Sequence, residues 1–383
     1  MSVTAAKGFT AAGIAAGIKD NGSPDLALVV NTGPCRAAAG VFTSNRVKAA
    51  PVLWSEQVLR SGRLAAVVLN SGGANACTGP KGFQDTHATA EKAAGVLGVG
   101  AGEVAVCSTG LIGVPLPMDR LLPGVETAAG RLSEHGGEKA AIAIKTTDTV
   151  HKTSVVTGDG WTVGGMAKGA GMLAPGLATM LVVLTTDADV ESAVLDRALR
   201  EATRVTFDRV DSDGCMSTND TVLLLASGAS GLTPGYGAFA EAVRAVCDDL
   251  GQQLVRDAEG ASKDIRIEVV NAASENDAVE VGRSVARNNL LKCALHGEDP
   301  NWGRVLSAIG TTSAAFEPDR LNVAINGVWV CRNGSVGEDR EKVDMRYREI
   351  HIVADLAAGT DTATIWTNDL TADYVHENSA YSS

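Results

Sequence analysis

Short apolar segments alternate irregularly with segments of helical periodicity along the whole chain, and this alternation restricts the fold more than any other feature. Segments that are rich in β-branched residues and bounded by Gly, Pro or Asn predict strands. We expect strands at residues 26–31, 38–43, 65–70, 104–108, 154–157, 161–166, 222–226, 265–270 and 350–354. Helical spacing predicts helices at residues 85–97, 140–144, 190–202, 237–258 and 276–286. This irregular order favours a layered α/β protein over a strictly parallel βαβ sheet.

Size and charge narrow the class of protein further. With 383 residues the chain exceeds the length at which one core stops growing, so we expect two lobes. A net charge of −12 without a block of Lys or Arg argues against nucleic acid as a partner. No apolar run reaches the roughly 18 residues of a membrane span. Seven cysteines without paired spacing suit reduced thiols, so we expect a cytoplasmic enzyme.

Three familiar site motifs fail on their context. Residues 169–174 (GAGMLA) match a dinucleotide fingerprint, but Pro175 and Gly176 interrupt the helix that must follow it. The Asp211–Gly214 segment has the wrong register for a calcium loop, so a turn is expected there. The six histidines are scattered without metal-ligand spacing, and neither a serine elbow nor a P-loop is present.

The segment that carries chemistry is the glycine-rich stretch 164–181 (GGMAKGAGMLAPGLATML), which leads into a very apolar strand through Thr179. Glycines allow a close or strained approach of the backbone, so such a loop can present a reactive peptide bond. Physics alone leaves a second interpretation open, in which the loop is a tight turn that feeds a core strand.

Several motifs, in order and spread over essentially the whole chain, resemble the ornithine acetyltransferase family, also called bifunctional glutamate N-acetyltransferases. The glycine-rich segment resembles the family's self-cleavage motif. The other motifs are NSGGANACTG (70–79), STGLIG (108–113), TTDT (146–149), STNDT (217–221), DPNWGR (299–304) and the C-terminal ENSAYSS (377–383).

This resemblance implies autocatalytic cleavage of the Ala178–Thr179 bond. The products are an α chain, 1–178, and a β chain, 179–383, which fold together as one body with two lobes. Thr179 then carries a free α-amine with a pKa of about 7.7–8.0, which serves as the base for its own hydroxyl. By the same resemblance the Thr109 hydroxyl and the Gly110 N–H form the oxyanion hole.

The resemblance also supplies the substrate-binding residues and the reaction. The binding residues carried over are Thr146, Lys168, Thr179, Glu259, Asn378 and Ser383. We expect Lys168 to meet the α-carboxylate and Glu259 to pair with the ornithine δ-ammonium. The implied reaction is ping-pong acetyl transfer from N-acetylornithine to glutamate in arginine biosynthesis.

The implied protein is an α2β2 heterotetramer with an αββα sandwich fold of the N-terminal-nucleophile-like type. It needs no metal or redox cofactor, and acetyl-CoA is a further candidate acetyl donor. Two other functions remain open. An N-terminal-nucleophile amidohydrolase or peptidase would use water as the acceptor. A non-catalytic binding protein would keep the chain uncleaved.

Overall fold

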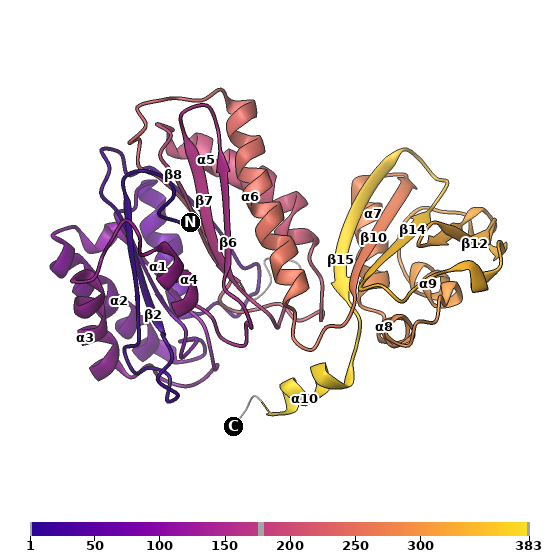
Figure 1. Ribbon diagram of the computed structural model, residues 1–383, viewed down its shortest axis with the longest axis horizontal. Helices are drawn as coiled ribbons and strands as arrows, with labels where there is room; N and C mark the ends of the chain where they lie inside the picture. Colours follow the sequence, from indigo (N-terminus) through magenta and orange to yellow (C-terminus); the bar gives the residue numbers. More distant parts are fainter. Residues whose placement is uncertain (1, 175–179, 381–383) are drawn as a thin grey trace. The chain divides into compact units, whose positions relative to one another are not determined.

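The computed structural model describes residues 2–174 and 180–380, and these form two compact units. The first unit comprises Met1–Ala170, Gly176–Asp208 and Met216–Leu254. The second comprises Gly171–Pro175, Arg209–Cys215 and Val255–Ser383. In Figure 1 the colour follows the sequence, from indigo at the N-terminus to yellow at the C-terminus. The first unit draws on both sides of the expected cleavage point, which therefore does not coincide with a boundary between the units.

A four-stranded sheet in the first unit has the order β1-β2-β4-β5. Its strands are β1 (Phe9–Ile14), β2 (Leu26–Asn31), β4 (Ala66–Asn70) and β5 (Val104–Ser108). The β1–β2 and β2–β4 pairs are antiparallel, whereas β4 and β5 run parallel. Because β4 and β5 end side by side, the two loops that follow them emerge at one edge of the sheet.

The second sheet of this unit has five strands in the order β3-β9-β8-β7-β6. They are β3 (Ala38–Phe42), β6 (Lys152–Thr157), β7 (Thr162–Lys168), β8 (Leu181–Thr186) and β9 (Thr221–Ala226). Only β8 and β9 are parallel neighbours. All six residues of β8 and all six of β9 are buried, as expected for apolar strands covered on both faces.

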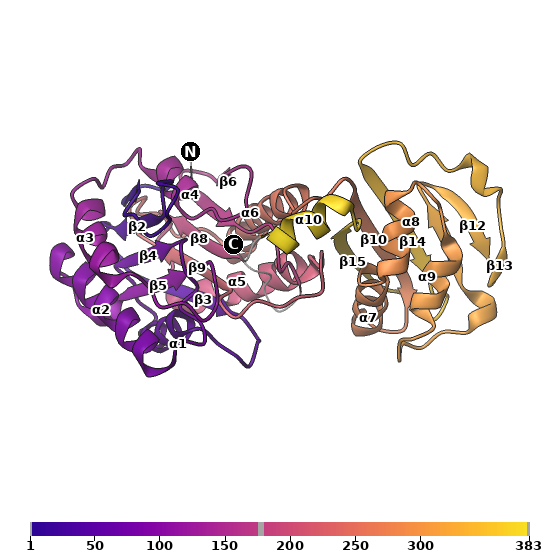
Figure 2. The same ribbon diagram turned by 90° about the horizontal axis from the view of Figure 1, so that it is seen from below.

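The two sheets of this unit share one core. Val67 and Val106 of the first sheet join Val183 and Leu223 of the second in a single apolar cluster. The first sheet is covered by α1 (Ala50–Val58), α2 (Gly79–Leu97) and α3 (Met118–Ala129), with α4 (Gly137–Ala143) against β1 and β2. The second is covered by α5 (Ser192–Val205), which contacts β3 and β9, and by α6 (Tyr236–Arg256), whose Val246 and Leu250 lie against Gly165 of β7. The layers therefore run helix, sheet, sheet, helix (Figure 2), and the expected αββα arrangement is confirmed.

The second unit has one six-stranded sheet in the order β13-β12-β11-β14-β10-β15. Its strands are β10 (Asp264–Ala272), β11 (Asn322–Ile325), β12 (Val328–Arg332), β13 (Ser335–Val336), β14 (Glu349–Asp355) and β15 (Asp361–Asn368). Its helices are α7 (Glu275–Ala286), α8 (Asn289–His296), α9 (Trp302–Ile309) and α10 (Ala372–Ala380). An apolar core between the sheet and helices α7 to α9 holds this unit together.

Sequence periodicity located β2 to β10, β14, α2 and α4 to α7, but it missed β1, β11 to β13, β15, α1, α3 and α8 to α10. The α2 helix begins at Gly79, six residues before the expected start, because Pro80 lies in the first turn, where the missing N–H costs nothing. The α3 helix was not predicted, and it contains Pro123, a residue that usually interrupts helices. No helix follows Gly169 as far as residue 174, which agrees with rejection of the dinucleotide fingerprint.

Candidate active site

The turn that contains Thr109 and Gly110 follows β5 and is fixed by the loop after β4. The Thr109 N–H donates to the Asn70 carbonyl at 3.0 Å, and the Gly73 N–H donates to the Thr109 carbonyl at 3.0 Å. The parallel pairing of the two strands brings these segments together. Thr109 is consequently buried, and its position depends on two separate backbone hydrogen bonds.

Gly110 adopts a conformation that only glycine tolerates at this place. Its φ is +133°, and a Cβ atom here would lie 2.6 Å from the Gly73 nitrogen. Within the part of the chain that the structure describes, no acceptor takes the Gly110 N–H. This amide is therefore a donor available to a ligand, as an oxyanion hole requires.

Lys168 ends β7 and reaches the same turn. Its ammonium group donates to the Thr109 hydroxyl oxygen at 3.3 Å, although the two residues are 59 positions apart in the sequence. Lys168 is only 2% exposed, so its charge lies in a medium that screens it weakly. The structure thus brings together two of the residues carried over by the resemblance, and it places a cation beside the candidate oxyanion donors.

Asp148 connects Thr146 to the Lys168 segment. Its carboxylate accepts the N–H of Thr146 at 3.0 Å, the N–H of Gly169 at 2.6 Å and the ammonium group of Lys152 at 2.7 Å. The side chains of Asp148 and Lys152 are fully buried. Burial alone would raise the pKa of Asp148, but the charges of Lys168 and Lys152 and the Gly169 N–H lower it to about 2. Asp148 is therefore ionised throughout the physiological range.

Two further candidate residues meet in the second unit. The Asn378 side-chain amide, on α10, donates to the Glu259 carboxylate at 2.9 Å. Gly171 leaves room for this carboxylate, since a Cβ atom there would lie 2.5 Å from a Glu259 oxygen. Burial, with the nearby charges of Asp213 and Glu259, raises the pKa of Tyr374 to about 12. Glu259 and Asn378 therefore form one polar pair.

A small cavity of about 50 Å³ adjoins Glu259 within the same unit, and Lys292 and Asp213 line it. Burial lowers the pKa of Lys292 to about 8, although Asp213 and Asp211 oppose this shift. The Lys292 ammonium group donates to the Ser212 carbonyl and to the Thr367 hydroxyl. The charged lining therefore belongs to the polar surroundings of Glu259.

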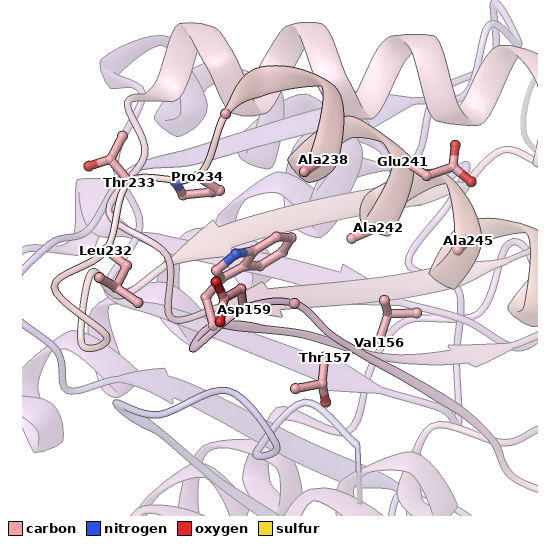
Figure 3. Close-up of a pocket in the computed structure, with 13 residues that line it drawn as sticks. Val156, Thr157, Asp159, Leu232, Thr233, Pro234, Ala238, Glu241, Ala242 and Ala245 are labelled. Carbon is pink, nitrogen blue, oxygen red and sulfur yellow. The ribbon is translucent and has the colours of Figure 1, made fainter.

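A larger cavity, of about 620 Å³, lies elsewhere in the first unit. Figure 3 shows it between the β6–β7 hairpin and the first turns of α6, with Leu232, Pro234 and Ala242 among its apolar lining. None of the residues carried over by the resemblance lines it. This cavity therefore does not coincide with the residues carried over by the resemblance.

The remaining candidate residues, Ala178, Thr179 and Ser383, lie outside the described residues. Over 2–174 and 180–380, no group of three or more His, Cys, Asp or Glu side chains could hold a metal ion. None of the described helices is long and apolar enough to cross a membrane.

Sequence reasoning assigned no role to Asp148 or to the buried residues Asn219 and Asp220, which the structure places beside the candidate residues. All three residues lie in segments that carried the resemblance, at 146–149 and 217–221. That location was the only signal in the sequence, because their contacts join segments remote along the chain.

Comparison with known proteins gives consistent matches. The family model described as ArgJ family matches residues 10–383. The arginine biosynthesis bifunctional protein ArgJ of Streptomyces coelicolor is 88% identical over 383 residues, which is all of both chains. The protein of the same name from Mycobacterium tuberculosis is 58% identical over 389 residues, covering all of this chain and 96% of that one. A further match is a crystal structure of ornithine acetyltransferase complexed with ornithine, from M. tuberculosis. Its sequence is 62% identical to this chain in the matched region, and the TM-score is 0.45. The match covers 47% of this chain and 96% of that chain.

Proposed function

Since this chain belongs to the ArgJ family, we propose that it transfers an acetyl group from N-acetylornithine to glutamate, giving ornithine and N-acetylglutamate in arginine biosynthesis. Its relatives carry the name arginine biosynthesis bifunctional protein, and one solved relative is an ornithine acetyltransferase holding ornithine. The local observation that carries the proposal is the Lys168 ammonium group 3.3 Å from the Thr109 hydroxyl oxygen, beside the Gly110 N–H.

The nucleophile in this proposal is Thr179, released by autocatalytic cleavage after Ala178. Cleavage yields an α chain, 1–178, and a β chain, 179–383, which remain one folded body. An N-terminal threonine needs no neighbouring histidine, because its own α-amine is partly unprotonated near neutral pH. The hydroxyl proton passes to this amine as the oxygen attacks the acetyl carbonyl carbon.

The two half-reactions then share one oxyanion hole. In the first, the carbonyl oxygen becomes an oxyanion that accepts hydrogen bonds from the Thr109 hydroxyl and the Gly110 N–H. The intermediate then collapses and its C–N bond breaks. The α-amine of Thr179 gives its proton to the departing nitrogen, and ornithine leaves. In the second, the glutamate α-amine attacks the acetyl ester, and N-acetylglutamate leaves as the threonine hydroxyl is restored.

Substrate binding follows from charge. Lys168 suits an α-carboxylate, which both amino acids carry, and Thr146 shares the Asp148 carboxylate with Gly169, the residue after Lys168. Glu259 suits the ornithine δ-ammonium, with Asn378 orienting its carboxylate. Ser383 completes the binding residues of the proposal.

Further parts of the proposal are an α2β2 assembly, a cytoplasmic location and no metal or redox cofactor. The proposal also includes acetyl-CoA as a second acetyl donor, because the names of the relatives describe a bifunctional protein.

The alternative is an N-terminal-nucleophile amidohydrolase, in which water accepts the acetyl group. Transfer and hydrolysis can be distinguished by measuring ornithine release from N-acetylornithine with and without glutamate. The Thr179→Ala variant is the inactive control. Transfer predicts faster ornithine release with glutamate and one N-acetylglutamate formed per ornithine. Release at a rate independent of glutamate, with free acetate as the product, would support the hydrolase instead. A chain that stays intact and releases no ornithine would support the non-catalytic binding protein.

A further inference from the structure

Two buried polar residues, Asn219 and Asp220, lie immediately before β9 and have no part in the mechanism above. Asn219 is 4% exposed and Asp220 is fully buried. A buried polar side chain costs free energy unless its hydrogen bonds are made, so its partners indicate why it is there.

Asn219 fixes the end of the strand that carries the oxyanion hole. Its side-chain amide donates to the Ser108 carbonyl at 2.8 Å and to the Ala74 carbonyl at 2.6 Å. Ser108 directly precedes Thr109, and Ala74 directly follows Gly73, which binds the Thr109 carbonyl. Both protons of one amide are therefore used to hold the two loops that frame Gly110.

Asp220 fixes the beginning of β8. One oxygen of its carboxyl group accepts the Met180 N–H at 3.0 Å. The backbone repeats this connection, because the Met180 carbonyl accepts the Thr221 N–H at 3.2 Å. Met180 is the residue after the proposed nucleophile, so Asp220 holds the amide that directly follows position 179.

The surroundings of the Asp220 carboxyl group disfavour its ionised form. Among the residues that the structure describes, none hydrogen-bonds its second carboxyl oxygen, and none forms an ion pair with it. An ionised carboxylate in such surroundings would be very costly. Burial raises the pKa of Asp220 well above its usual value, although the Met180 N–H, the Ser217 hydroxyl and the charge of Lys168 oppose the shift.

We propose that Asn219 and Asp220 are positioning residues that fix the oxyanion hole and the start of the nucleophile strand relative to each other. Adjacent in sequence, they hold two segments that are about 70 residues apart, and neither needs to touch the substrate. This inference rests on the proposed function, because family membership assigns the nucleophile to Thr179. Asp220 holds the N–H of Met180, the residue that follows it. A misplacement of about 1 Å in such a site can lower a rate about 100-fold.

The test compares the rate of self-cleavage in three variants with that of the wild type. Asp220→Asn keeps an uncharged side chain with an acceptor for the Met180 N–H, whereas Asp220→Leu keeps similar bulk without an acceptor. Asp187→Leu is the matched control, since Asp187 is also buried and follows the opposite end of β8. There its carboxylate accepts the N–H groups of Lys7 and Thr162.

Each protein is refolded from denaturant, and its conversion to two chains is followed by intact mass, with thermal unfolding measured in parallel. We expect Asp220→Asn to cleave within about threefold of the wild-type rate, because its hydrogen bond survives. The folded fraction of Asp220→Leu should cleave at least about tenfold more slowly. Asp187→Leu should lose stability but cleave at the wild-type rate. A folded Asp220→Leu that cleaves at the wild-type rate, or an Asp220→Asn as slow as Asp220→Leu, would overturn the inference.

A second measurement covers the case in which Asp220→Leu does not fold. The pH dependence of kcat/KM is compared for cleaved wild type and cleaved Asp220→Asn. A neutral Asp220 predicts the same acidic limb in both, whereas a carboxylate beside the amine would move this limb to lower pH on substitution and contradict the inference. If the wild type itself does not cleave, the proposed function fails first, so the two failures are distinguishable.

Discussion

Replacement of Asp148 by Asn should destabilise the first unit strongly at neutral pH. The carboxylate accepts two backbone N–H groups and the ammonium group of the buried Lys152. The substitution leaves a buried lysine without its counter-charge and turns an NH2 group toward one of the N–H donors. Loss of one partner from a buried ion pair typically costs about 3–5 kcal/mol of unfolding free energy.

The pKa of Asp148 provides an independent magnitude. A fall from 3.8 to about 2 corresponds to about 2 kcal/mol, at about 1.36 kcal/mol per unit. Because this carboxylate has a lower pKa in the folded chain than in the unfolded one, its contribution is complete well above pH 3.8. It disappears as the pH falls through about 2. We therefore expect a loss of about 3 kcal/mol at pH 7, smaller by about 1 kcal/mol at pH 3.

Urea unfolding in the uncleavable Thr179→Ala background measures this free energy in a single chain. Asp187→Asn is the control, since Asp187 is buried and accepts two backbone N–H groups but forms no ion pair with any residue that the structure describes. The Asp187→Asn variant should lose about 1 kcal/mol at pH 7. A loss below about 1 kcal/mol for Asp148→Asn, or the same loss at both pH values, would refute the assigned role of the ion pair.

Three shorter predictions concern the candidate site. Thr109→Ala should lower kcat about 100- to 1000-fold and change the melting temperature little, which steady-state kinetics and thermal unfolding of the cleaved enzyme can check. Gly110→Ala should abolish self-cleavage in refolded protein followed by intact mass, because the new Cβ atom would lie 2.6 Å from the Gly73 nitrogen; normal processing would contradict this. Glu259→Gln should raise KM for N-acetylornithine more than KM for glutamate, and an equal rise for both substrates would remove the assignment of Glu259 to the δ-ammonium.

Local pattern was sufficient for the strands with sharp boundaries. The β2 and β5 strands were predicted with their observed limits, because each is a continuous apolar run that ends at a polar residue, Asn31 or Ser108. The β1 strand was missed because its sequence, FTAAGI, consists largely of small residues without a β-branched run. Its Gly13 is needed for packing, since a Cβ atom there would meet the Lys139 carbonyl at 1.9 Å.

The relations between distant residues could not be predicted from local pattern. Resemblance indicated Thr109 and Lys168 as members of one site, but their contact depends on how two different sheets meet. Asp148 was quoted within a motif without a role, because nothing in the sequence shows that its carboxylate would receive the N–H of Gly169, 21 residues later. The same holds for Asn219 and Ser108, which are 111 residues apart.

The central claim is that Thr179 becomes an N-terminal nucleophile. Intact mass of the purified wild-type protein under denaturing conditions, with N-terminal sequencing of any smaller species, tests it most directly. We predict two chains, the second beginning Thr179-Met180-Leu181, and a single chain for Thr179→Ala. A wild-type protein that remains one chain of 39.3 kDa after long incubation would contradict the account, because the free α-amine that activates the hydroxyl would never form.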